Sequence, residues 1–240
     1  MKSYKINCDV GEGVGNEFEL MPYIHYCNIA CGGHAGDSNS MNEIAEIAIR
    51  NNVLIGAHPS YPDRVNFGRK TMQLSSEELI RTIQSQIESL LSIVKSKGKS
   101  LFHIKPHGAL YNDISNNTEL SLTFLEAIEP YKFDLKLFVP YNSVIEKEAI
   151  KSGFSIIYEV FADRNYNDDL SLVSRNEENS MIANSKDVIT HVHEIIESGK
   201  VTTITNKKVI IKANTFCVHS DTDNAVLLVK ELYKLLADKK

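Results

Sequence analysis

The sequence predicts a parallel α/β fold, and three observations point to it. Short strand-like runs alternate with longer helix-like segments along nearly the whole chain, seven such units occur, and no linker, repeat or composition break divides them. Alternating strands and helices form βαβ units around a parallel sheet. Seven units fit a closed barrel better than an open sheet, so we expect residues 1–240 to form one TIM-like (β/α)7 barrel domain.

The expected strands are short runs rich in β-branched and aromatic residues. In chain order they are Tyr4–Asp9, Tyr26–Cys31, Val53–Ala57, Leu101–Lys105, Leu135–Val139, Ile156–Val160 and Thr215–Val218. The expected helices are the longer segments Met41–Asn51, Ser75–Lys97, Glu119–Ile128, Ser143–Ser152, Lys186–Ser198 and Asp223–Ala237. In addition, VTTITNKKVIIKA predicts a hairpin around Asn206, inserted before the last strand.

The helix that begins at Ser75 has the clearest signals. SSEELI offers a capping serine followed by acidic residues in the first turn, where they interact favourably with the helix dipole. KSKG then closes the helix with basic residues and a glycine. Between these ends an apolar stripe recurs at helical spacing, formed by Ile80, Ile83, Ile87, Leu90, Leu91 and Val94.

Composition excludes several classes of protein. The chain is 42% hydrophobic and 24% charged, carries a net charge of −5, and has no long run among its 26 basic residues, so a nucleic-acid groove is not expected. No run approaches the ~18 apolar residues of a membrane span, and MKSYKINCDV lacks the apolar core of a signal peptide. The four cysteines lie in apolar stretches without CxxC spacing, which predicts buried, reduced thiols in a cytoplasmic protein: Cys8, Cys27, Cys31 and Cys217.

Ionisable residues follow six of the seven expected strands. In chain order these are Asp9 and Glu12, His34 and Asp37, His58 and Asp63, Lys105 and His107, Glu159 with Asp163 and Arg164, and His219 with Asp221. A single such residue is usually part of a turn or a loop. Six coincidences are hard to explain by folding alone, and the carboxyl ends of parallel strands form the face where active sites lie. We therefore expect an active site at this rim.

A metal site is the main competing use of the same rim. Asp9, His34, His58, His107 and His219 are ligand types that suit zinc or another divalent ion, and the first three are the set we would test. No two of these histidines have the HxH or HxxxH spacing of a compact site, so the composition permits a metal without requiring one. The remaining histidines are expected to be surface, packing or strand residues: His25, His103, His191 and His193.

A nucleotide site of the P-loop kind is not expected. GKS at residues 98–100 lacks the first glycine of that motif, because Ile93 stands in its place, and the tripeptide precedes a strand instead of following one. GEGVG near the N-terminus is weak evidence for phosphate binding.

Six stretches together resemble the LamB/YcsF family: INCDVGEGVG, NIACGGHAGD, IGAHPSYPDRVNFGRK, KPHGALYN, EVFADRNY and FCVHSDT. They run from Ile6 to Thr222 in the family's order. Ser220, Lys70 and Asn66 depart from the pattern, which usually has glycine, arginine and glycine there. The resemblance implies a barrel of the glycoside hydrolase/deacetylase type. It also implies ATP-dependent opening of 5-oxo-L-proline to L-glutamate by a 5-oxoprolinase of which this chain is the A subunit, with the B and C subunits as partners.

Applied to this sequence, the resemblance implies roles for the rim. We expect Asp9 and His107 to transfer protons, with His34 or His58 as alternates, and Lys105 and Arg164 to hold the substrate carboxylate or a phosphoryl group. The residues expected to bind substrate, phosphate or the Mg²⁺ of ATP are Glu12, Asp63, Arg69, Glu159, Asp163, Arg164, His219 and Asp221. Two alternatives remain: a metal-dependent deacetylase or amidohydrolase on the same barrel, and a non-catalytic substrate-binding protein of the same complex. The sequence leaves open which chain of the complex binds ATP.

Overall fold

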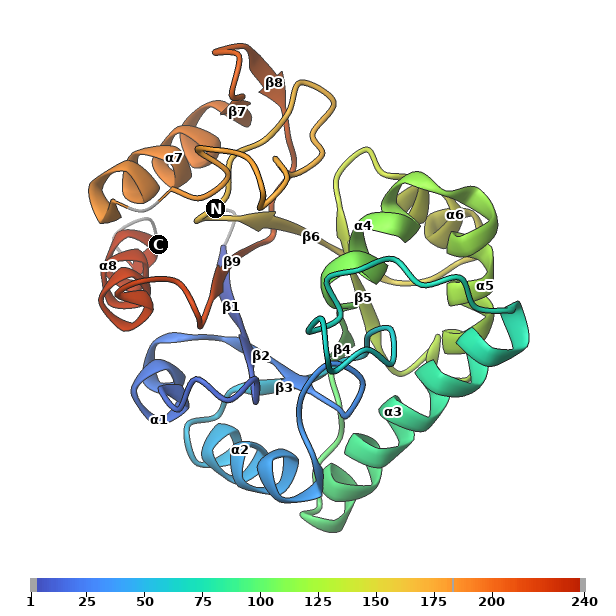
Figure 1. Ribbon diagram of the computed structural model, residues 1–240. Coiled ribbons are helices and arrows are strands. Elements are labelled where there is room, and N and C mark those ends of the chain that lie inside the picture. The colour runs from blue at the N-terminus through green and yellow to red at the C-terminus, as the bar shows by residue number, and fades with distance from the viewer. Residues whose placement is uncertain (1–3, 183, 238–240) are drawn as a thin grey trace.

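The computed structural model describes residues 4–182 and 184–237, and a closed barrel of seven parallel strands lies at its centre (Figure 1). The strands are β1 (Lys5–Val10), β2 (Tyr26–Ala30), β3 (Leu54–His58), β4 (His103–Ile104), β5 (Lys136–Pro140), β6 (Ile156–Phe161) and β9 (Thr215–His219). The barrel closes because β9 pairs in parallel with both β6 and β1. The predicted barrel is therefore confirmed, with β4 shorter than expected.

Helices surround the barrel on the outside (Figure 1). They are α1 (Glu17–Leu20), α2 (Ser38–Arg50), α3 (Ser76–Ser96), α4 (Gly108–Asn116), α5 (Thr118–Ile128), α6 (Val144–Lys151), α7 (Ser185–Ser198) and α8 (Ala225–Ala237), with 3-10 turns at Met21–Tyr23 and Glu129–Tyr131. The capping serine predicted for α3 is confirmed as Ser75, and it forms a capping box in which Ser75 and Glu78 bind each other's backbone N–H groups. The hairpin is β7 (Lys200–Thr202) with β8 (Lys208–Ile210), and Asn206 takes the left-handed conformation in its loop.

Two of these helices, α1 and α4, are not predicted by the sequence pattern, and α4 is the one that matters for the site. The pattern predicts a loop at KPHGALYN, because glycine usually interrupts a helix. Gly108 is required here for another reason: its φ is +56°, and a Cβ at this position would lie 2.6 Å from the carbonyl oxygen of Gly68. The loop after β3 therefore packs directly against the start of α4.

The barrel interior below the rim is filled by hydrogen-bonded polar side chains. Asn28 Nδ2 donates to Asn7 Oδ1 at 2.8 Å, Asn7 Nδ2 donates to Thr215 Oγ1 at 2.9 Å, and His103 Nε2 lies 2.6 Å from Asn28 Oδ1. Gly56 makes room for this layer, because a Cβ there would come within 2.1 Å of the His103 ring. Buried polar groups that are paired in this way fix one arrangement, so this layer is a rigid floor for the site.

The aliphatic strand residues face outward and form the core with the helices. In β1, for example, Ile6, Cys8 and Val10 alternate with the inward-facing Asn7 and Asp9, and all five are buried. The four cysteines are buried and unpaired, as predicted. Among the described helices, none is both long and apolar enough to cross a membrane.

Candidate active site

A cavity of about 560 Å³ opens at the carboxyl ends of the barrel strands. Its wall includes residues that end β1, β3, β6 and β9, together with the start of α4 and the segment 169–176 that follows β6. Volumes of this size are typical of small-molecule sites. The register explains the convergence: Asp9 is paired with His219 across β1 and β9, so side chains far apart in the sequence reach one rim.

Lys105 lies at the centre of the first group of charges. Its Nζ is 2.7 Å from Asp9 Oδ1, 2.9 Å from Glu159 Oε1 and 3.1 Å from Cys217 Sγ. Burial alone would lower the pKa of Lys105, but the neighbouring Asp9, Cys217 and Glu159 raise it well above its usual value. Lys105 is thus a charged ammonium group already opposed by two buried carboxylates, which leaves it little capacity to bind a substrate anion.

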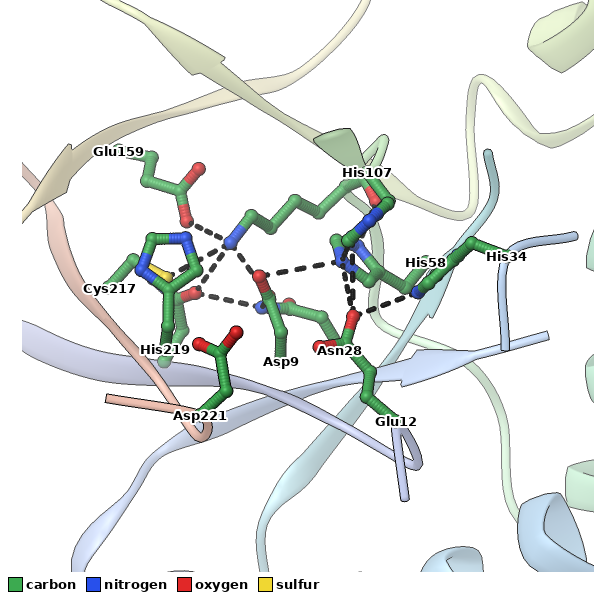
Figure 2. Close-up of polar contacts among 12 residues, drawn as sticks. Asp9, Glu12, Asn28, His34, His58, His107, Glu159, Cys217, His219 and Asp221 are labelled. Carbon is green, nitrogen blue, oxygen red and sulfur yellow. Dashed lines mark hydrogen bonds and ion pairs between the residues drawn. The ribbon is translucent and has the colours of Figure 1, made fainter. Parts of the chain in front are cut away.

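Asp9 connects this group to a cluster of histidines (Figure 2). Its Oδ1 accepts hydrogen bonds from Lys105 and, at 2.7 Å, from Asn28, while its Oδ2 lies 3.4 Å from His58 Nε2. Burial would raise the pKa of Asp9, but His58 and Lys105 outweigh it and hold the pKa well below its ordinary value. Asp9 is therefore an ionised carboxylate with one oxygen committed to the barrel floor and the other directed at His58.

The histidine cluster consists of His34, His58 and His107 around Glu12 (Figure 2). Glu12 Oε1 lies 2.8 Å from His34 Nε2, 3.2 Å from His107 Nδ1 and 3.7 Å from His58 Nε2. The rings of His34 and His107 are stacked, with centroids 3.5 Å apart. Burial lowers the pKa of the His34 imidazole to about 3. One ligand atom from each of the four residues lies within 4.8 Å of all the others, so the group could hold a metal ion.

Asp163 and His219 form a second pair, in which Asp163 is buried and His219 is half-buried. The Asp163 carboxylate accepts hydrogen bonds from the His219 backbone N–H at 3.0 Å and from the Thr222 hydroxyl at 2.7 Å, and it lies 3.1 Å from His219 Nδ1. Burial would raise the pKa of Asp163, but His219 and Thr222 lower it to about 2. Asp163 therefore orients His219, which lines the cavity.

Asp163→Asn tests this role through the pH dependence of stability. The folded-state pKa lies below the unfolded value of about 3.9, so ionised Asp163 contributes stability above that pH which is lost as the pH falls through about 2. We expect the variant to lose about 2 kcal/mol of unfolding free energy at pH 7 in urea titrations. The difference in unfolding free energy between the variant and the wild type should become smaller as the pH falls from 4 to 2. A difference that stays constant over that range, or an equal loss in the exposed control Asp187→Asn, would contradict the assignment.

Three arginines gather at the mouth of the cavity: Arg69, Arg164 and Arg175. Asp221 Oδ2 lies 2.7 Å from Arg69 Nη2 and 3.9 Å from Arg175 Nη1. The buried Arg164 instead donates to the carbonyl oxygens of Ser180 and Val173. Burial and the nearby Arg175 lower the pKa of Arg164 to about 10. Among the described residues Arg164 forms no ion pair, so its guanidinium is the group at this end of the cavity that suits an anion.

The structure does not bring every expected residue to the cavity. Asp63 accepts hydrogen bonds from the backbone and side-chain nitrogens of Asn66, so it stabilises its own loop and is not part of the cavity wall. Asp37 caps α2. Lys70, the departure from the family pattern, is exposed.

Two residues of the cavity wall are missed by sequence reasoning. Arg175 lies in an irregular segment without a motif, and its position depends on how that segment folds back over the barrel. Tyr111 is buried beside Glu159, and burial together with that carboxylate raises its pKa well above the usual value. Its place in α4 is not evident from the sequence, because KPHGALYN has the pattern of a loop.

Comparison with known proteins finds similarity along nearly the whole chain. The sequence pattern of the LamB/YcsF family matches residues 4–240. The A subunit of 5-oxoprolinase from Bacillus cereus (strain AH820) is 37% identical over 246 residues, which cover 100% of this chain and 97% of that protein. The corresponding protein of Bacillus cereus (strain B4264) is 38% identical over 240 residues, covering 98% and 95%.

A solved structure is similar to this chain in fold as well as in sequence. The lactam utilization protein from Thermus thermophilus superimposes with a TM-score of 0.91 at 32% sequence identity, covering 100% of this chain and 97% of that one. Together, the match to the family pattern, the relatives above 30% identity and the shared barrel establish that the chain belongs to the LamB/YcsF family.

Proposed function

We propose that this chain is the A subunit of a 5-oxoprolinase and takes part in opening the lactam of 5-oxo-L-proline to L-glutamate. The observation that carries the proposal is full-length similarity, at 37–38% identity, to relatives named as the A subunit of 5-oxoprolinase. The solved relative named as a lactam utilization protein supports the same substrate class. Ionised Asp9 and the guanidinium of Arg164 in the cavity wall support it too, because a lactam amino-acid substrate needs a proton-transfer group and an anion site.

The chemistry explains why ATP would be required. Resonance makes the lactam carbonyl a poor electrophile. Transfer of the terminal phosphoryl group of ATP to the lactam oxygen would give a carbon that water can attack. Cleavage of the C–N bond, with a proton delivered to the leaving nitrogen, then opens the ring to an acyl phosphate, and a second water releases phosphate and glutamate. The site must therefore hold a base, an acid and groups that neutralise negative charge.

Asp9 is our choice for the base. It is ionised, and its Oδ2 is the oxygen that is not bound by Lys105 or Asn28. His107 is our choice for the acid, with His58 and His34 as alternates, because His107 and His58 line the cavity and the His34 ring is stacked on that of His107.

Lys105 and Arg164 are the two residues expected to hold the anion, and Arg164 is the better suited of the two. Arg164 has no carboxylate partner among the ion pairs of the described chain, whereas Lys105 has two. A guanidinium with unused N–H donors is well suited to a carboxylate or a phosphoryl group. We therefore propose that Arg164, flanked by Arg69 and Arg175, receives the substrate carboxylate or the phosphoryl group.

ATP with Mg²⁺ and two partner proteins, the B and C subunits of 5-oxoprolinase, complete the proposal. The names of the relatives describe one subunit of an enzyme, which supports an assembly with other chains. The sequence has no P-loop, so we propose that the partners supply the activated substrate and that this chain carries the ring-opening half. The four unpaired, buried cysteines support a reducing compartment such as the cytoplasm.

The proposal is tested by glutamate release from 5-oxo-L-proline with ATP and Mg²⁺. We expect no glutamate from this chain alone and steady release when its cognate B and C subunits are added. The partners are first verified with an authentic A subunit from a Bacillus relative. Failure of this chain to release glutamate with verified partners would reject the proposal.

A second function is favoured by the group of three histidines and Glu12, which is a plausible set of metal ligands. A metal-dependent deacetylase or amidohydrolase on the same barrel would hydrolyse an amide without ATP. Hydrolysis of an N-acetylated sugar or a linear amide by this chain alone, abolished by a chelator, would support that alternative over the oxoprolinase.

A further inference from the structure

We propose that Glu12, His34, His58 and His107 form a binding site for one divalent transition-metal ion of the zinc type. This site would lie in the wall of the cavity beside Asp9, and it differs from the Asp9, His34 and His58 set that the sequence permits. It is independent of the Mg²⁺ that accompanies ATP, and with an ion bound His107 would serve as a ligand in place of its role as the acid of the ring opening.

The hydrogen bonds of His58 and His107 carry the argument. His58 Nδ1 lies 2.6 Å from the carbonyl oxygen of Lys105, and His107 Nε2 lies 3.0 Å from that of Phe67. A carbonyl oxygen only accepts, so each of these ring nitrogens carries a hydrogen. The two remaining nitrogens, His58 Nε2 and His107 Nδ1, lie 3.0 Å apart. In neutral imidazoles both are acceptors, so either a second proton on one ring or a cation beside them must join the pair.

Glu12 brings a further acceptor to the same point. Its Oε1 lies 3.2 Å from His107 Nδ1 and 3.7 Å from His58 Nε2, and His34 Nε2 lies 2.8 Å away on the other side. A single shared proton can join only two of these four atoms. One metal ion can satisfy all of them at once, because each offers a lone pair once the His34 ring adopts the matching tautomer.

The spacing of the four atoms is that of a coordination shell. Ligand atoms about 2.0–2.1 Å from a tetrahedral ion lie roughly 3.3–3.4 Å from one another. The short contacts in this group, at 2.8, 3.0, 3.2 and 3.7 Å, lie on both sides of that value, and no ligand pair is more than 4.8 Å apart. Small side-chain adjustments would therefore complete the site without movement of the strands.

The surroundings also have the form expected around metal ligands. A ligating histidine usually donates its second N–H to a carbonyl or carboxylate, which fixes the ring, and His58 and His107 both do so. Gly68 supports the same wall, because an added Cβ there would lie 3.0 Å from both His34 and His107. Three imidazole nitrogens with one carboxylate favour zinc, cobalt or a similar ion over magnesium, which prefers oxygen ligands. Such an ion would supply Lewis-acid chemistry beside Asp9.

The test measures metal binding by the purified full-length chain, without reference to activity. The protein is stripped with a chelator, reconstituted with Zn²⁺ and desalted, and the metal is counted by mass spectrometry. We expect about one ion per chain. Reconstitution with Co²⁺ should give the visible absorption of a four-coordinate site with nitrogen ligands. His58→Ala and His107→Ala should both lose the ion, whereas the matched control His193→Ala, at an exposed position on α7, should keep it.

Glu12→Gln provides a variant that keeps the shape of the side chain and should fold even if a histidine variant does not. It should weaken Zn²⁺ binding by at least about tenfold, measured by competition with a chromophoric chelator. The proposal is overturned if folded wild-type protein retains no ion after reconstitution, or if Glu12→Gln and the histidine variants bind as tightly as His193→Ala. Because binding is read directly, this result and that of the glutamate assay can fail separately.

Discussion

Replacing Lys105 by methionine is expected to lower the free energy of unfolding by about 3–5 kcal/mol at pH 7 and to abolish turnover. The methionine keeps most of the aliphatic stem but removes the ammonium group that lies 2.7 Å from Asp9 and 2.9 Å from Glu159. Both carboxylates are almost fully buried, so water cannot solvate the negative charge of either one after the ammonium group is removed. A buried charge that loses its partner costs far more than the pair contributed, which is the reason for the size of the effect.

Urea unfolding of two further variants separates charge from packing. The triple variant Lys105→Met, Asp9→Asn, Glu159→Gln has no uncompensated charge, so we expect it to regain most of the lost stability while remaining inactive. Lys147→Met makes the same exchange at an exposed position on α6 and should change stability by less than about 0.5 kcal/mol. If the triple variant were as unstable as Lys105→Met, the loss would come from packing, and the charge argument would be wrong.

The barrel could be predicted from the sequence because its signals are local and repeated. Each strand is a short β-rich run, most are followed by a helix with its own apolar stripe or cap, and parallel strands must send their carboxyl ends to one rim. The gathering of Asp9, His58, Lys105 and His107 follows from that rule. The sequence pattern misses the helix α4 because the reason for the glycine at its start is not local. Gly108 is required by a close contact with Gly68, which belongs to the preceding strand–helix unit.

The partners of each side chain could not be predicted, because they depend on which way the residue points and on how loops fold back. The sequence suggests that Lys105 binds substrate, but the side chain points into the barrel and meets Asp9 and Glu159. Asp63 follows a strand as the others do, yet it turns back onto Asn66. Arg175 reaches the cavity from an irregular segment with no periodic signal. The catalytic and binding roles given to these residues remain predictions.

Asp9→Asn is expected to reduce kcat for glutamate release by about 10²–10⁴-fold with little change in KM. The amide keeps the shape of the side chain and its oxygen can still accept from Lys105 and Asn28, so the barrel floor should persist. The amide cannot take a proton from water, and this loss is the origin of the expected effect. KM should remain unchanged because the proposed anion site, at Arg164, lies after β6 and not on β1. The exposed Asp187→Asn serves as the matched control and should retain wild-type kcat.

Glu159→Gln decides whether Asp9 acts as a base or only as a charge. Asp9→Asn and Glu159→Gln each remove one of the two carboxylates around Lys105, so the two substitutions should have similar electrostatic effects on that lysine. The two carboxylates differ in one respect: only Asp9 has its second oxygen beside the histidine cluster, 3.4 Å from His58 Nε2. We therefore expect kcat to fall much further in Asp9→Asn than in Glu159→Gln. Equal losses would assign both residues to holding Lys105 and would make His107 the first choice for the base.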